Sequence, residues 1–232
     1  MKLLTIIFLC LTLTILIADS SFTPWVGCFY SSAGYKTLNE LQDEFVKENS
    51  YHLENKVVDS FESMPGFHLK TMKNKGTLSF GSYLEYSSTG GRIDYRDYSG
   101  YSTLDIILNH NAIGLIVEDQ LIQNIHPRFK QYFSLGACFD QLSFISNTKL
   151  YGVGSQSTTD YLYSMGIIGA TGISYDILNK PFLLRVQAGG QLAYSQPFHL
   201  KGNSEAQLQT EKSKVSPDWS GFRAALLLGW VF

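Results

Sequence analysis

The feature that most constrains this chain is a regular alternation of apolar with small or polar residues toward its C-terminus. The segments 160–177, 181–196 and 218–232 all show it. Successive side chains of a β-strand point to opposite faces, so three consecutive segments with this period predict three strands. In the last segment the apolar face consists of Phe222, Ala224, Leu226, Leu228, Trp230 and Phe232.

The face opposite the apolar one indicates what surrounds these strands. It carries Gly, Ser, Ala and Gln with an occasional Arg, as at Gly189, Gln191 and Arg223. A soluble barrel such as a lipocalin turns a Lys- and Glu-rich face to water, whereas small residues suit the crowded interior of a narrow barrel. Charged residues make up 16% of the chain, against about a quarter in an average soluble protein. The pattern favours a barrel whose apolar face meets lipid, with a secreted soluble barrel as the alternative.

Turn signals divide the chain into eight predicted strands. An even number places both termini on one side and lets the first strand pair with the last, which removes the open edges. We therefore predict an all-β, eight-stranded, antiparallel, up-and-down transmembrane barrel. The predicted strands are 23–34, 64–73, 76–88, 101–118, 129–147, 160–177, 181–196 and 218–232.

The connections between these strands are of two kinds. Residues 74–76 and 179–180 are typical of tight turns. Short turns at one end and long loops at the other are characteristic of outer-membrane barrels. The predicted loops are the polar segments 35–63, 87–100, 149–160 and 197–217.

The N-terminus has the layout of a secretory signal peptide. Lys2 precedes an apolar run that ends at Ala18, and Ala18-Asp19-Ser20 fits a small-x-small cleavage site. The run is short for a spanning helix of about 20 residues, so a retained membrane anchor is the less favoured alternative. We expect residues 1–20 to be removed and residues 21–232 to form one barrel domain.

With its signal peptide and alternating segments, the chain resembles the small outer-membrane β-barrel family of Gram-negative bacteria. The resemblance is one of pattern and covers nearly the whole mature chain. It implies a location in the bacterial outer membrane, with the membrane lipid and the barrel assembly machinery as partners. In that family the last strand, ending in Phe, is the signal that this machinery reads. The matching residues here are Leu228, Trp230 and Phe232.

Motifs for metal, cofactor or nucleic-acid binding are not found. The five histidines are scattered without H-E-x-x-H or C-x-x-C spacing, and the net charge of −2 gives no global attraction to nucleic acid. Asn109-His110-Asn111 is one polar cluster that could serve a lipid-modifying enzyme. Such an enzyme also needs a serine nucleophile and an acid. Since neither can be assigned, we expect no enzyme and no cofactor.

Several charged residues are predicted to point into the barrel. Glu85, Asp140 and Arg223 lie at similar depth in their strands, with Arg185 lower down. Buried charges need partners, so these four are predicted to form a luminal ion-pair cluster that plugs the barrel. Eight strands leave little open lumen, which argues against a diffusion pore. Gln187 and Gln191 are the expected hydrogen-bond partners of the cluster.

Two cysteines remain in the mature chain. Cys28 falls in the first predicted strand and Cys138 in the fifth, on opposite walls of the ring. A disulfide needs Cα atoms within about 7 Å, so we predict two free thiols.

The first long loop carries an amphipathic segment at 37–49. Leu38, Leu41 and Phe45 fall on one helical stripe, and Thr37 with Glu40 fits a capping box. We expect a short helix that covers the barrel as a lid, or one that docks on a partner or the lipid headgroups.

The function that follows is a non-enzymatic one. A monomeric outer-membrane barrel with these loops would serve envelope integrity, adhesion or contact with an extracellular ligand. A lipid-modifying barrel enzyme and a narrow channel are the alternatives.

Overall fold

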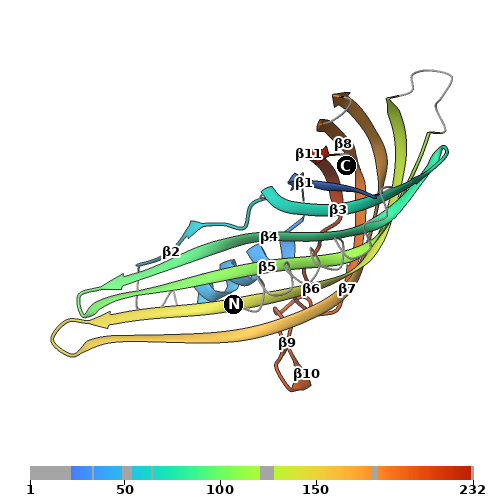
Figure 1. The fold of residues 1–232 in the computed structure, drawn as a ribbon. Coiled ribbons are helices and arrows are strands. Elements are labelled where there is room, and N and C mark those ends of the chain that lie inside the picture. The colour runs from blue at the N-terminus through green and yellow to red at the C-terminus, as the bar shows by residue number, and fades with distance from the viewer. Residues whose placement is uncertain are drawn as a thin grey trace.

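Eight antiparallel strands close into a ring in the computed structural model, which describes residues 22–32, 34–48, 54–63, 65–120, 128–178 and 182–230. Each ring strand pairs with the next along the chain, and the first pairs with the last (Figure 1). The predicted eight-stranded barrel is therefore confirmed. The ring strands are β1 (Phe22–Ser31), β3 (Pro65–Lys75), β4 (Leu78–Asp97), β5 (Gly100–Asp119), β6 (Phe129–Leu150), β7 (Gly154–Leu178), β8 (Phe182–Ser195) and β11 (Gly221–Trp230).

The alternation in the sequence separates the two faces of this ring. On β5, Ile113, Leu115 and Val117 are exposed on the outside, while Ile116 between them is 3% exposed. The interior is so narrow that paired glycines are needed in places. Gly114 of β5 and Gly136 of β6 lie opposite each other, and a Cβ on either would come within 2.7 Å or less of the Tyr83 ring or its hydroxyl.

Two of the predicted loops are instead continuous strand. Residues 87–100 and 149–160 extend β4 to β7, and the turns occupy only 98–99 and 151–153. Residues 149–160 are exposed on both faces, whereas the inner face at Ser87, Thr89 and Ile93 is buried. Small or polar residues stand on both faces of 87–91, so the hydropathy of that stretch does not alternate. The backbone groups of these extensions are nevertheless paired in ladders such as Arg96 with Tyr101. A strand is recognised in the sequence when apolar residues on one face alternate with polar residues on the other. These extensions lack that alternation, so the sequence pattern does not identify them as strands.

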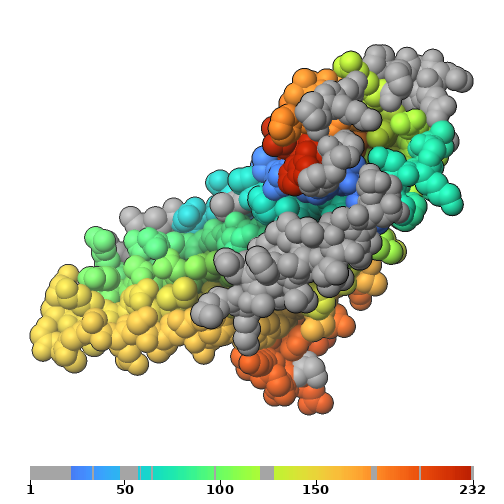
Figure 2. Space-filling model, viewed as in Figure 1, coloured from blue at the N-terminus to red at the C-terminus, as the bar shows by residue number. Residues whose placement is uncertain are grey.

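These extensions form a second structural feature, here called the projecting sheet. It consists of residues 88–109 and 141–163, which continue the four central strands past the level where β3 and β8 end. Figure 2 shows it as the green and yellow end of an elongated molecule. A short strand, β2 (Glu54–Asp59), pairs along β4 at this level.

The long segment before β11 also contains short strands. β9 (His199–Leu200) pairs with residues 162–163 of β7, and β10 (Asn203–Gln207) pairs with β9. Together with β2, these elements lie in segments predicted to be loops. They are too short and too polar to show a period.

The predicted helix is present as α2 (Lys36–Glu48). Leu38 and Leu41 are buried, and the ring of Phe45 lies 6.1 Å from that of Phe144 on β6. Since α2 begins at Lys36, Thr37 is not the N-cap that the capping-box pattern predicts, and its hydroxyl donates to the carbonyl of Ser216, 3.0 Å away. Within the described ranges, no helix is long and apolar enough to cross a membrane.

Both described cysteines are free thiols, as predicted. Cys28 is exposed on β1 and Cys138 is buried on β6. The Cys138 sulfur lies 3.7 Å from the hydroxyl of Ser195.

Candidate functional site

The inside of the barrel holds three polar layers, and the lowest is centred on Arg185. Its guanidinium donates to Glu118 and to Asp176, with one contact to Asp176 at 3.0 Å. The other oxygen of Glu118 accepts a hydrogen bond of 2.6 Å from Lys70 and one of 3.2 Å from Gln187. Glu118 therefore binds two cations from opposite walls of the barrel.

The cations of this lower layer also contact an aromatic ring. The Arg185 guanidinium carbon lies 4.1 Å from the centroid of the Trp25 ring, and the Lys70 nitrogen lies 5.3 Å from it. The Lys130 nitrogen lies 3.5 Å from an oxygen of Asp176. Cations buried against an aromatic face and paired with carboxylates are stabilised without water.

The middle layer is a two-point contact between Arg223 and Glu85. One Arg223 nitrogen lies 2.8 Å from Oε2 of Glu85, and the other donates to Oε1. Gln191 accepts a further bond of 3.2 Å from Arg223, and His68 Nδ1 lies 2.7 Å from Glu85 Oε1. The Arg223 guanidinium stacks at 4.5 Å on the ring of Phe29. Side chains from two further strands, His68 of β3 and Gln191 of β8, thus contact this pair.

The upper layer is centred on Asp140. Its Oδ1 accepts a hydrogen bond of 3.0 Å from the indole of Trp219 and lies 2.7 Å from His110 Nδ1. The rings of His110 and Trp219 are 4.1 Å apart, and Tyr35 meets Trp219 edge-on at 5.6 Å. Burial, and then the charge of Asp140, raise the pKa of the Tyr35 phenol above its ordinary value. This layer therefore joins the barrel wall to the segments above it.

The residues predicted as one luminal cluster are distributed over these three layers. Glu85 and Arg223 contact each other directly, whereas Arg185 lies in the lower layer and Asp140 in the upper. The residues are divided among layers because side chains from different walls are long enough to meet only when they lie at the same height in the barrel. Gln187 serves the lower layer and Gln191 the middle one.

Four further luminal residues were not identified from the sequence. All of them occupy inward-facing positions of their strands, so the alternation of inward and outward positions could have identified them. They are His68, Lys70, Glu118 and Asp176. The sequence analysis named His110, but not as a luminal partner of Asp140.

Above the upper layer lies an apolar cover, here called the lid, made of α2 and residues 208–220. An antiparallel bridge between Gly34 and Asp218 attaches it to β1 and β11. The side-chain amide of Gln191 donates to the carbonyl of Trp219 at 2.5 Å. The buried apolar side chains at this level are Leu38, Leu41, Phe61, Leu108, Leu142, Phe198 and Val215.

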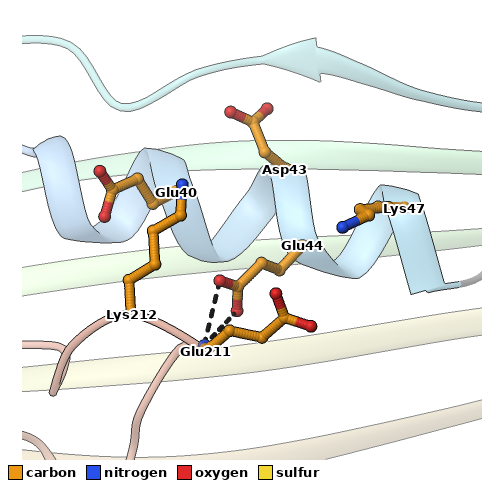
Figure 3. Close-up of a pocket in the computed structure, with 6 residues that line it drawn as sticks. All are labelled: Glu40, Asp43, Glu44, Lys47, Glu211 and Lys212. Carbon is orange, nitrogen blue, oxygen red and sulfur yellow. Dashed lines mark hydrogen bonds between the residues drawn. The ribbon is translucent and has the colours of Figure 1, made fainter.

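A pocket lies between α2 and the loop at 211–212 (Figure 3). The backbone N–H of Glu211 donates to both carboxylate oxygens of Glu44, at 3.1 and 3.2 Å. Across the described ranges, no group of three or more potential ligands is placed to hold a metal ion. The pocket is thus a contact between the two parts of the lid. Its lining residues are Glu40, Asp43, Glu44, Lys47, Glu211 and Lys212.

The Asn109-His110-Asn111 cluster is divided between the two sides of the wall. His110 is 1% exposed inside the barrel, with Asp140 as its partner. Asn109 lies on the outer side, where it accepts a 3.2 Å hydrogen bond from the hydroxyl of Tyr86. His110 is therefore not part of an outward-facing Ser/His/acid group.

The outer side of the ring carries a band of exposed apolar residues, here called the outward belt. Leu228 extends it on β11, next to Trp230. Phe232 and the signal peptide at 1–20 lie outside the described residues. The belt includes at least one large residue from each ring strand, namely Tyr30, Phe67, Phe80, Leu115, Phe133, Ile167, Leu192 and Leu226.

No protein-family model matches the chain, and no curated protein matches it in sequence. Among solved structures, Ail, the attachment invasion locus protein of Yersinia pestis, is similar with a TM-score of 0.41 and 14% identity, over 91% of this chain and 97% of that one. The outer membrane protein OprG from Pseudomonas aeruginosa gives a TM-score of 0.45 and 13% identity, over 91% and 95%. Neisserial surface protein A gives 0.38 and 12%, over 91% and 97%. These similarities are weak in sequence and in superposition.

Proposed function

We propose that this chain is a non-enzymatic barrel of the bacterial outer membrane that acts as a monomer and presents its projecting sheet and lid outside the cell. The observation that carries the proposal is that the ring has the reverse polarity of a water-soluble barrel. Its outside is the apolar belt, and its inside holds the charged residues. A closed ring satisfies its backbone hydrogen bonds internally, as a membrane-spanning structure requires.

The belt argues for lipid over water. Large apolar patches are rare on soluble monomers, where about 300–600 Å² is already the largest patch. Here the exposed apolar side chains continue around all eight strands, and Leu115 alone is 69% exposed. A lipid environment removes this surface from water.

The interior argues against a channel. Three layers of paired side chains lie in the lumen, and the lid lies above them. An eight-stranded barrel has an interior just wide enough for side chains to fill. Our proposal is therefore a plugged barrel whose activity lies in its external surfaces.

Export and assembly belong to the same proposal. Residues 1–20 would direct secretion, and the outward Leu228 and Trp230 with Phe232 would be the signal read by the barrel assembly machinery. Outward apolar residues at alternate positions of the last strand support this role.

The test is made by expression in a Gram-negative host. We expect the protein in the outer-membrane fraction, with a gel band that shifts on boiling. Recovery as a soluble periplasmic or secreted protein would contradict the proposal.

A pair of variants sharpens this test. Leu115→Arg places a charge in the belt and should cost about 2–4 kcal/mol near the middle of a bilayer, which lowers the amount of assembled barrel. Thr103→Arg places the same charge on the outer face of the same strand, but in the projecting sheet, and should have little effect. Equal tolerance of both substitutions would indicate a water-exposed belt.

A further inference from the structure

The far end of the projecting sheet carries a second exposed apolar surface. The β4–β5 and β6–β7 turns lie next to each other, because Gly100 pairs with Leu150 (Figure 1). Tyr98 is 98% exposed and Val153 82%, the largest values of any large apolar residues in the described chain. We call this surface the tip patch, and it consists of Tyr98, Tyr101, Leu150, Tyr151 and Val153.

A backbone hydrogen bond joins the two turns to each other. The backbone N–H of Tyr151 donates to the carbonyl of Ser99 across the turns, at 2.8 Å. Gly152 and Gly154 have φ of 83° and 133°, conformations that glycine adopts without strain. A preorganised apolar tip loses little conformational entropy when it binds.

A mostly polar stretch separates the tip patch from the outward belt. Along β5 its outer face carries Asn109, Ile107, Asp105 and Thr103 in successive rows, and Arg92 of β4 is paired to Asp105. The ten residue-to-residue steps from Tyr101 to Asn111, at a rise of about 3.3 Å each, span about 33 Å along the strand. The tip patch therefore lies well outside the bilayer that the belt would occupy.

Two basic residues flank Tyr101 of the tip patch. Tyr101 of β5 pairs with Arg96 of β4 on one side and with Lys149 of β6 on the other, and the backbone of Glu54 in β2 pairs with Arg96 in turn. The side chains of Arg96, Tyr101 and Lys149 are exposed and share one face of the sheet. The end of the molecule thus combines aromatic and aliphatic side chains with two positive charges, one on each side of Tyr101.

We propose that the tip patch binds the surface of an anionic lipid bilayer other than the one that the barrel spans. Tyrosines with Leu and Val at the tip and Lys and Arg just behind it match the order of an interface, where apolar groups enter the acyl boundary and cations stay with the phosphates. The tip is convex, so it inserts into a fluid phase without needing a complementary groove. A hydrated polysaccharide would not remove the apolar side chains of Leu150 and Val153 from water, so binding to it would not be stabilised by them.

The tip inference rests on the proposed membrane barrel, and the experiment distinguishes failure of the barrel from failure of the tip inference. The full mature protein is folded into nanodiscs of phosphatidylcholine, and its gel shift on boiling reports insertion. Vesicles of phosphatidylcholine, with or without phosphatidylserine, are then added and co-sedimentation is measured. We expect binding to the anionic vesicles that weakens as salt is raised. Failure to insert contradicts the barrel itself, whereas insertion without binding to anionic vesicles overturns only the tip inference.

Two variants assign the binding to the tip. Replacing Arg96 and Lys149 by Gln should weaken binding to anionic vesicles by about fivefold for each charge, or about thirtyfold together. The control replaces Lys36 and Lys201 by Gln, which removes the same charge from exposed positions elsewhere, and should leave binding unchanged. If the control loses as much as the tip variant, the inference is wrong.

The apolar part of the tip is tested by Tyr98→Ser, Tyr151→Ser and Val153→Ser combined. We expect a loss of about tenfold or more in vesicle binding with the gel shift unchanged. In a Tyr151→Trp variant, the added fluorescence should shift to the blue when anionic vesicles are added, because the side chain leaves water. Unchanged binding by the triple variant, or no blue shift, would show that the tip does not enter lipid.

Discussion

Arg223 of β11 donates two hydrogen bonds to the carboxylate of Glu85 of β4, 138 residues away in sequence, in the middle of the lumen. Breaking a buried pair leaves the other charge without compensation, which typically costs about 3–5 kcal/mol. We expect Glu85→Ala to lower the free energy of unfolding by this amount, measured by urea unfolding in lipid vesicles. The double variant with Arg223→Ala should lose less than the sum of the two single changes. Additive losses would mean that the pair is not coupled.

The contacts of the lower layer predict which of its two carboxylates contributes more to stability. Glu118 is bonded to Lys70 and Arg185, both buried, so Glu118→Ala removes a carboxylate from two buried cations. The side chain of Asp176 is 14% exposed, and its removal leaves Arg185 still paired. We therefore expect Glu118→Ala to destabilise the barrel more than Asp176→Ala in the same urea measurement. The reverse order would contradict the assigned contacts.

The lid should respond independently of the barrel. Leu38 has no exposed surface, so Leu38→Ala should destabilise the lid by about 2–5 kcal/mol. Hydrogen exchange of the α2 amides is the measurement, and faster exchange with an unchanged gel shift is expected. Lys36→Ala is the control on the same helix, since the Lys36 side chain is 86% exposed and should matter little. Unchanged protection in Leu38→Ala would show that the helix does not dock.

Alkaline pH should weaken the fold partly through Tyr35. Burial and Asp140 raise its pKa in the folded protein above the ordinary value of about 10. Below that pH the phenol is neutral in both states and contributes no pH dependence. Above it only the unfolded chain ionises, so the free energy of unfolding falls by about 1.4 kcal/mol per pH unit. We expect Tyr35→Phe to lose stability less steeply between pH 9 and 11; equal slopes would place Tyr35 in water.

The ring could be predicted from the sequence because lipid-type and lumen-type residues differ at every second position. On β5 the outward Ile113, Leu115 and Val117 contrast with the inward Ala112, Gly114 and Glu118. Residues 101–109 and 141–147 of the projecting sheet fall within predicted strands, but residues 149–160 could not be predicted, since they are exposed on both faces. Strand pairing there depends on the hairpin register and leaves no periodic trace.

The candidate site could be predicted in its residue types and only partly in its contacts. Glu85 and Arg223 were placed at one depth because both lie mid-strand. Asp140 was placed with them, but it accepts from Trp219, a residue of the lid whose position depends on the long segment before β11. In an alternating strand the depth of a residue can be counted from the strand end. Such segments do not alternate, so their contacts cannot be placed in this way.

The central claim is that the outward belt faces lipid, and Trp230 reports on it directly. Trp25 and Trp219 are 3% exposed inside the barrel, whereas Trp230 lies at the end of the outward face of β11. The protein is reconstituted in lipids brominated near the headgroup, and tryptophan fluorescence is compared with that in unbrominated lipid. We predict quenching in the wild type that disappears in Trp230→Phe. Quenching that survives in Trp230→Phe, or a Trp230 signal reached by aqueous acrylamide and not by bromine, would contradict a lipid-facing belt.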